Sequence, residues 1–140
     1  MNILMPVDGS EYTKRMLSYI AAHDELLGAQ HEFTILTVVP LLPAGVTGFL
    51  ERAMADAYYE ECAQEVLRPI KAFTDQKGWK VQLISRKGHA AEVVAEFAEK
   101  HPTDLIVMGT HGRSVIGSVV LGSVATGVLA RTKVPVLLVR

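Results

Sequence analysis

The segment GTHGRSVIGSVVLGS, residues 109–123, is the most informative part of this sequence. It carries glycines at positions 109, 112, 117 and 122, a serine follows the last of them, and the apolar run Leu105–Met108 leads into it. A strand that ends in glycines and precedes a helix presents bare backbone N–H groups, which bind anions. Glycine also lets a phosphate approach the main chain, because no Cβ stands in its way. We therefore interpret this segment, the glycine loop, as a phosphate-binding loop and the rest of the chain as its scaffold.

Strand-like and helix-like segments alternate along the whole chain. Short apolar or β-branched runs predict five strands, at Asn2–Val7, Phe33–Val39, Trp79–Ser85, Asp104–Met108 and Val134–Val139. Apolar residues at helical spacing predict helices over Glu11–Leu27, Phe49–Gln76 and Ala90–His101, and a last helix that Ser123 caps. This alternation is typical of a parallel sheet whose strands are joined by right-handed helical crossovers.

Local signals predict how these elements begin and end. Ser10 follows the first strand and is a candidate N-cap of the first helix. The stretch Pro40–Gly48 holds two prolines and two glycines, which predicts a loop without regular structure. Pro69 lies inside the long helical pattern and is expected to kink or split it. The partial alternation of Trp79–Ser85 predicts an edge strand.

Composition limits the class of protein. The 140 residues are expected to form one domain, residues 1–140, with a substantial core. The 14 Lys and Arg nearly balance the 15 Asp and Glu, which gives no support for binding nucleic acid or a membrane surface non-specifically. The uncharged run Ser114–Ala130 is too short and polar for a membrane helix. The single cysteine, Cys62, excludes an intrachain disulfide and, without a secretory signal, favours the cytoplasm.

The spacing of the glycines excludes two common phosphate-binding motifs. A P-loop requires a lysine after its second glycine, and the segment Gly112–Ser118 has none. A dinucleotide-binding fold requires G-x-G-x-x-G after the first strand and an acid after the second, and both are missing here. What remains is G-x2-G-x9-G-S, formed by Gly109, Gly112, Gly122 and Ser123. The first two glycines can surround one side of a polyphosphate, and Ser123 with the helix N-terminus can close the other side.

These segments resemble the universal stress proteins, and the resemblance covers nearly the whole chain. The matching pieces are ILMPVDGS (3–10), ILTVVP (35–40), DLIVMGTHGRS (104–114), VLGSVATGVL (120–129) and VPVLLVR (134–140). The spacing G-x2-G-x9-G-[ST] is the signature of the ATP-binding branch of that family, and it is complete in this chain. The resemblance implies a three-layer open α/β fold of the adenine nucleotide alpha hydrolase type. Its parallel five-stranded sheet has the strand order 3-2-1-4-5, with helices on both faces.

The resemblance also implies where a nucleotide binds, because this order puts the ends of strands one and four side by side. By resemblance, Asp8 meets the ribose or the metal-bearing phosphates, Pro6 and Val7 border the nucleotide, and the backbone of Val38 recognises the adenine edge. The residues expected to hold the ribose and phosphates are Met108, Gly109, Gly112, Gly122, Ser123 and Val124. Arg113 either reaches a phosphate or projects into solvent. The cofactors are ATP and the Mg²⁺ that it carries.

Three functions stay open at this stage. The first is a cytoplasmic regulatory protein of the stress response that binds Mg·ATP or another adenine nucleotide and changes its shape or partners with occupancy. The second is a slow ATPase, although no P-loop lysine and no obvious general base indicate a catalytic residue. The third is a nucleotide-free interaction module, which the intact glycine spacing disfavours. Two loop residues are not expected to contact the ligand: Gly117 shapes the loop, and His111 is exposed to solvent.

The end of the chain predicts a partner. In the implied strand order the last strand is an edge, and Val134–Arg140 is apolar until its final residue. An uncovered apolar edge is a pairing site unless something covers it. A second copy of the chain, pairing antiparallel about a two-fold axis, would cover it, and the family shows a similar arrangement. The sequence therefore predicts a homodimer through this segment.

Overall fold

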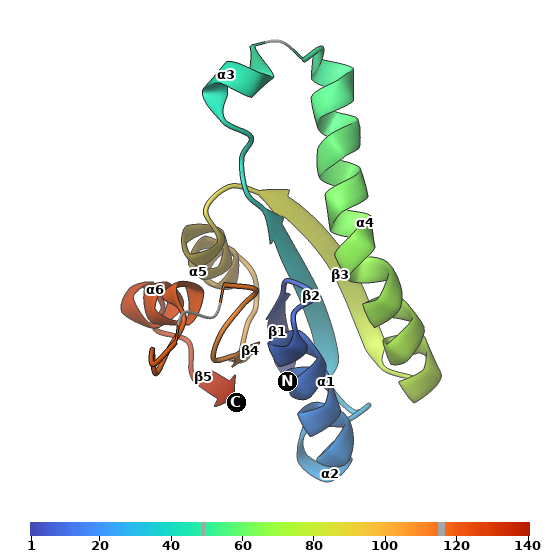
Figure 1. Ribbon diagram of the computed structural model, residues 1–140. Coiled ribbons are helices and arrows are strands. Elements are labelled where there is room, and N and C mark those ends of the chain that lie inside the picture. The colour runs from blue at the N-terminus through green and yellow to red at the C-terminus, as the bar shows by residue number, and fades with distance from the viewer. Residues whose placement is uncertain (49, 115–116) are drawn as a thin grey trace.

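A computed structural model describes residues 1–48, 50–114 and 117–140 of the chain. Five parallel strands form one sheet in the order β3-β2-β1-β4-β5, which is the order that the family resemblance implies (Figure 1). The strands are β1 (Asn2–Val7), β2 (Glu32–Val39), β3 (Lys80–Lys87), β4 (Leu105–Gly109) and β5 (Val136–Val139). The segment predicted to alternate as an edge strand, now β3, is one edge of this sheet, and β5 is the other.

Helices cover both faces of the sheet and make three layers. They are α1 (Glu11–Ala22), α2 (Asp24–Leu27), α3 (Ala44–Thr47), α4 (Arg52–Lys77), α5 (Ala90–Lys100) and α6 (Ser123–Arg131). Helices α1 and α4 pack on one face, and α5 and α6 pack on the other. Among the described residues, no helix is both long and apolar enough to cross a membrane.

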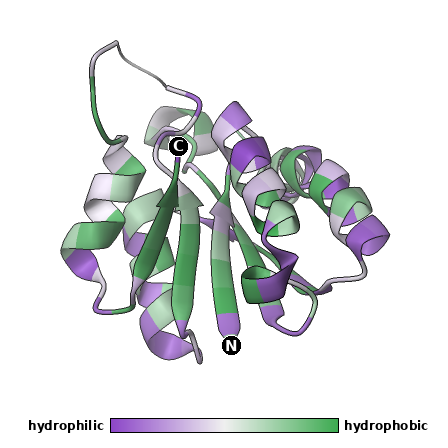
Figure 2. Cartoon of the chain, turned by 90° about the horizontal axis from the view of Figure 1, so that it is seen from below, coloured by the Kyte–Doolittle hydropathy of each residue, from purple (hydrophilic) through white to green (hydrophobic). Residues whose placement is uncertain are grey.

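The two cores follow from the alternation of side chains along the strands. In β1, Ile3 and Met5 face the core under α1 and α4, whereas Leu4 faces the core under α5 and α6. The strands are therefore apolar on both faces, as expected for a covered parallel sheet. Figure 2 shows this as hydrophobic strands in the centre and hydrophilic segments on the outer surfaces of the helices.

The first predicted helix, Glu11–Leu27, is interrupted at His23, and α2 continues the chain. The His23 backbone leaves helical geometry, with φ −115° and ψ 43°, and its N–H is shared between the Tyr19 and Ile20 carbonyls, each at 3.1 Å. A bond shared with the i−3 carbonyl is common where an α-helix ends. The His23 ring adds to this end, because its Nδ1 lies 2.8 Å from the Tyr19 carbonyl oxygen and the ring stacks on Tyr19, with ring centroids 4.1 Å apart.

The region between β2 and β3 differs from the prediction in three ways. The stretch Pro40–Gly48 contains one short helix, α3. Its first turn begins with a hydrogen bond from the Val46 N–H to the Pro43 carbonyl, at 2.9 Å. Helix α4 begins at Arg52, while Phe49, where its start was predicted, lies outside the described residues. Of the two predicted outcomes for Pro69, a kink or a split, the split is wrong, because α4 runs unbroken to Lys77 (Figure 1). The proline is exposed, and buried neighbours such as Ile70 hold both halves of the helix on the sheet.

Smaller corrections concern the ends of elements. Strand β4 extends through Gly109, so the first glycine of the glycine loop belongs to the sheet. Strand β5 starts at Val136, two positions after the predicted Val134. The N-cap of α6 is Gly122, and Ser123 is the first helical residue, so the prediction that Ser123 caps this helix is wrong. Ser10 does cap α1, since its Oγ accepts the Thr13 N–H at 3.4 Å.

Candidate functional site

The strand order reverses between β1 and β4, and the sheet opens there. The two strands are paired at Ile3↔Leu105 and Leu4↔Ile106, and this register is not continued to Val7 or Gly109. On its other side, β1 stays paired with β2 as far as Val7↔Thr37. An opening at the carboxyl ends of strands, where the order reverses, is the usual ligand crevice of an open α/β sheet.

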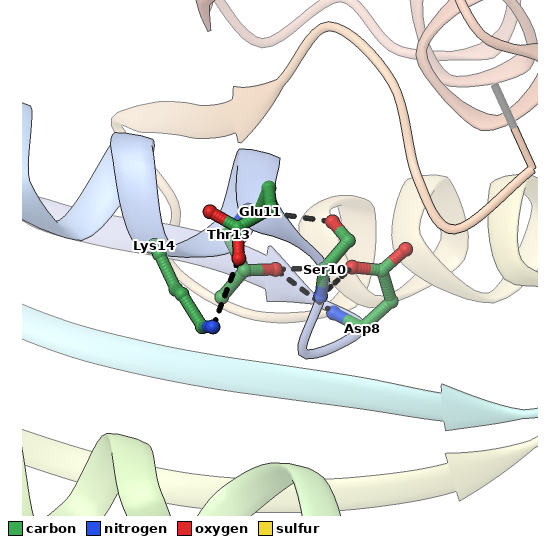
Figure 3. Close-up of polar contacts among 5 residues, drawn as sticks. All are labelled: Asp8, Ser10, Glu11, Thr13 and Lys14. Carbon is green, nitrogen blue, oxygen red and sulfur yellow. Dashed lines mark hydrogen bonds and ion pairs between the residues drawn. The ribbon is translucent and has the colours of Figure 1, made fainter.

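The Asp8 carboxylate connects the two loops that border this crevice. Its Oδ1 accepts the Ser10 N–H at 2.9 Å and the Thr13 hydroxyl at 3.1 Å (Figure 3). Its Oδ2 accepts the Arg113 N–H from the glycine loop at 3.1 Å. The carboxylate therefore ties the turn after β1 to the loop after β4. In the first turn of α1, the hydrogen bond and charge of Lys14 lower the pKa of the exposed Glu11.

The substitution Asp8→Asn is expected to destabilise the protein by about 1–2 kcal/mol, because only one side-chain oxygen would remain. The amide nitrogen would face the N–H of either Ser10 or Arg113, and a donor cannot satisfy a donor. Urea unfolding followed by circular dichroism measures this loss. The control is Asp56→Asn, whose exposed carboxylate lies 4.0 Å from the Lys87 ammonium and should change stability by less than about 0.5 kcal/mol. Equal stability of the two variants would contradict the role of Asp8 as a tether.

The glycine loop is closed at its base by two contacts. The Gly122 N–H donates to the Thr110 carbonyl at 2.7 Å. The His111 ring bridges the same gap, with Nδ1 2.9 Å from the Thr110 hydroxyl and Nε2 2.8 Å from the Val119 carbonyl oxygen. The expectation that His111 is a solvent-exposed loop residue is therefore wrong, since both of its nitrogens are engaged and its ring centroid lies 5.0 Å from that of Tyr12.

The motif glycines serve mainly to admit neighbouring groups. A Cβ on Gly109 would lie 2.7 Å from the Tyr12 Cβ, and one on Gly112 would lie 2.6 Å from an Asp8 carboxylate oxygen. A Cβ on Gly122 would lie 3.1 Å from the His111 Cα. Gly117 differs, because it has open space around it and a positive φ of 48°, which fits the predicted role in shaping the loop.

Two backbone N–H groups of the glycine loop already have partners. Those of Gly122 and Arg113 donate to Thr110 and Asp8. The N–H groups in the first turn of α6, which starts at Ser123, cannot donate to a carbonyl within the helix. Because Gly122 is held at Thr110, this helix N-terminus lies directly beside the end of β4.

The backbone of Val38 borders the crevice from β2. In a strand, the N–H and C=O of one residue point to the same side, and successive residues alternate. The Val39 carbonyl accepts the Gly88 N–H at 3.0 Å on the β3 side, so the backbone groups of Val38 point to the β1 side. The register Val7↔Thr37 engages the Val38 N–H with the Val7 carbonyl, whereas the Val38 carbonyl lies past the last residue of β1 and faces the space beyond its end.

The remaining predicted site residues lie around the same opening but differ in what they offer. The side chains of Val7 and Met108 are buried in opposite cores, so only their backbones can border a ligand. Pro6 is half-buried in β1, and Val124 packs at the edge of the core under α6. The guanidinium of Arg113 folds back over the turn after β1, where its Nη2 lies 3.2 Å from the position of a Cβ on Gly9.

A cavity of about 290 Å³ lies beyond Val38, at the carboxyl ends of β2 and β3. It is lined by Val39, Asp56, Tyr59, Glu60, Ser85, Arg86 and Lys87. The Tyr59 hydroxyl accepts the Leu42 N–H at 2.9 Å and thereby ties the segment before α3 to α4. This cavity lies at the same end of the strands as the crevice, on the side of β2 away from the glycine loop.

Comparisons with known proteins agree with this architecture. The universal stress protein family matches residues 1–140. A universal stress protein of Methanocaldococcus jannaschii, MJ0531, is 31% identical over 99% of this chain and 81% of its own length. The solved structure of MJ0577 superposes with a TM-score of 0.83 at 30% identity, over 99% of this chain and 94% of that one.

Two more distant structures were solved with nucleotides. A universal stress protein in complex with cAMP is 22% identical, with a TM-score of 0.66 over 100% of this chain and 96% of that one. A universal stress protein from Archaeoglobus fulgidus in complex with dAMP is 20% identical, with a TM-score of 0.66 over 100% of this chain and 98% of that one. At these identities the likeness shows a shared fold. The family match over the whole chain and the sheet order together establish that this chain belongs to the universal stress protein family.

Proposed function

We propose that this protein binds an adenine nucleotide, Mg·ATP, between β1 and β4 and acts as a cytoplasmic regulatory protein whose partners respond to occupancy. The observation that carries the proposal is the opening where the β1–β4 register stops. The first turn of α6 borders it on one side, and the backbone of Val38 borders it on the other. The cAMP and dAMP complexes of distant relatives support an adenine nucleotide as the ligand class.

Each part of the nucleotide would meet a matching group. The Val38 C=O, which lies past the end of β1, offers an acceptor that complements the N6 amino group of adenine. The N–H groups of Ser123 and Val124, with the Ser123 hydroxyl, would donate hydrogen bonds to a phosphate at the positive end of α6. Oδ2 of Asp8 accepts one hydrogen bond and keeps a lone pair for a ribose hydroxyl or a water of Mg²⁺.

Isothermal titration with Mg·ATP tests the proposal directly. We expect binding in the range of about 1–100 μM, equivalent to roughly 5.5–8 kcal/mol. Arg113 is the only charged side chain between Gly109 and Ser123, so phosphate release should be slow, on the scale of hours. An absence of heat with ATP, ADP and AMP would refute nucleotide binding.

We also propose that two copies pair through β5. The carbonyls of Pro135 and Val139 accept the N–H groups of Ile106 and Thr110, both at 2.9 Å, so these residues face β4. By alternation, the backbone groups of Val136 and Leu138 point outward from the sheet edge. The segment is apolar, as an interface strand requires.

Sedimentation velocity at tens of micromolar (a rough working concentration) should show a dimer for the parent chain and a monomer for Val136→Pro. Proline at this position removes an outward N–H without removing a hydrogen bond to β4. Val136→Thr keeps the N–H and should remain dimeric. A parent chain that sediments as a monomer would contradict pairing through β5.

A further inference from the structure

We propose that His111 is a positioning residue of the nucleotide site, whose ring holds the two sides of the glycine loop at a fixed separation. The inference rests on the proposed function. His111 lies two residues after the end of β4, yet its ring reaches across the loop to Val119, close to the start of α6. One side chain thereby joins the two segments that are proposed to surround the phosphates.

The hydrogen bonds of the ring define its tautomer. A carbonyl oxygen can only accept, so Nε2, which lies 2.8 Å from the Val119 oxygen, carries the proton. In the neutral ring Nδ1 is then an acceptor, and the Thr110 hydroxyl donates to it across 2.9 Å. Thr110 is only 4% exposed, so the ring also satisfies a buried hydroxyl. With both nitrogens engaged, His111 acts on the ligand through the loop and not by contact.

The ring is itself supported from α1. Tyr12 lies against one side of it, with ring centroids 5.0 Å apart, and the Arg15 guanidinium carbon lies 5.1 Å from the centroid of the Tyr12 ring. Gly109 allows this approach, because a Cβ there would meet the Tyr12 Cβ at 2.7 Å. The support makes the position of His111 independent of a bound nucleotide, which is the condition for a preformed site.

Beside the ring, one backbone bond among the described residues of the loop closes it, from the Gly122 N–H to the Thr110 carbonyl. The exposed side chains of Val119 and Val120, at 52% and 72%, give that side of the loop little packing. Losing the ring should therefore loosen the start of α6 relative to Gly112 without disturbing either core. The expected effect is on affinity and much less on global stability.

Three variants separate this role from a merely structural one, with titration of Mg·ATP and thermal unfolding as the readouts. His111→Phe keeps a ring against Tyr12 but loses both hydrogen bonds, and should weaken binding about tenfold. His111→Gln can again donate an N–H to the Val119 carbonyl and should recover affinity to within about threefold of the parent. The exposed His89 has no side-chain cap hydrogen bond, and His89→Phe should bind like the parent. Unchanged binding by His111→Phe, or no recovery by His111→Gln, would overturn the proposal.

Amide hydrogen exchange provides a readout that does not depend on the nucleotide. The Gly122 N–H should exchange at least about tenfold faster in His111→Phe than in the parent, and at nearly the parent rate in His111→Gln. If the parent chain binds no nucleotide, the proposed function fails, and the exchange rates still decide whether His111 closes the loop. Equal Gly122 exchange in the parent and His111→Phe would overturn the positioning role.

Discussion

Replacing Gly122 with valine is expected to abolish binding of Mg·ATP, with a loss of more than about 100-fold, or roughly 2.7 kcal/mol. A Cβ at this position would lie 3.1 Å from the His111 Cα and 3.2 Å from the Thr110 carbonyl oxygen. Both neighbours are backbone atoms, which cannot turn aside as a flexible side chain can. The branched side chain would therefore push the start of α6 away from the end of β4 and break the 2.7 Å bond to Thr110.

The matched control is Gly45→Val, because a Cβ on Gly45 meets no atom within 4 Å. Titration of both variants with Mg·ATP gives the comparison, and circular dichroism verifies that Gly122→Val keeps its helices. The two cores lie outside the altered contact, so the fold should persist. If Gly122→Val binds ATP as tightly as the parent, the phosphate site has been assigned to the wrong part of the molecule.

The largest expected effect on stability is that of Phe33→Ala, which should lower the free energy of unfolding by about 3–5 kcal/mol. Phe33 is 2% exposed, and its ring centroid lies 5.0 Å from that of Trp79. Trp79 in turn meets the ring of Phe73 from α4 in an edge-on arrangement at 5.8 Å. Truncation would leave a cavity between β2 and α4 and remove an aromatic contact from the middle of this cluster.

Urea denaturation measured by tryptophan fluorescence reports this loss, because the single tryptophan is part of the cluster. Leu26→Ala is the control for removing an apolar side chain, since Leu26 is 72% exposed and should change stability by less than about 0.5 kcal/mol. A loss of less than about 1 kcal/mol for Phe33→Ala would mean that the core closes around the gap at little cost.

Much of the architecture was predictable because its signals are local. The strands are short apolar runs and the helices carry apolar residues at helical spacing, so their order and the parallel sheet follow from neighbouring residues alone. The errors lie where a local preference met a stronger contact. Pro69 was expected to kink or split α4, and burial of flanking residues against the sheet keeps the helix from splitting. At His23 the backbone leaves helical geometry, and its N–H is shared with the Ile20 carbonyl, so α1 ends early.

The candidate site was only partly predictable. The G-x2-G-x9-G-S spacing located the glycine loop, and the strand order located the opening between β1 and β4. The family resemblance pointed to the backbone of Val38, and the sheet register supplies the reason, since β2 extends past the end of β1. No pattern indicated that His111 spans the loop, because nothing in the residues around it marks the carbonyl of Val119 as its partner.

The order of residues was sufficient for the five strands and the four longer helices, for the parallel arrangement of the strands and for the position of a loop rich in glycine. The folded chain alone shows why those glycines are there. Gly109 and Gly112 make room for Tyr12 and Asp8, which approach from a segment about a hundred positions earlier. Whether a Cβ would fit at these glycines depends on the groups that folding brings near them. The sequence pattern does not show the distances to those groups.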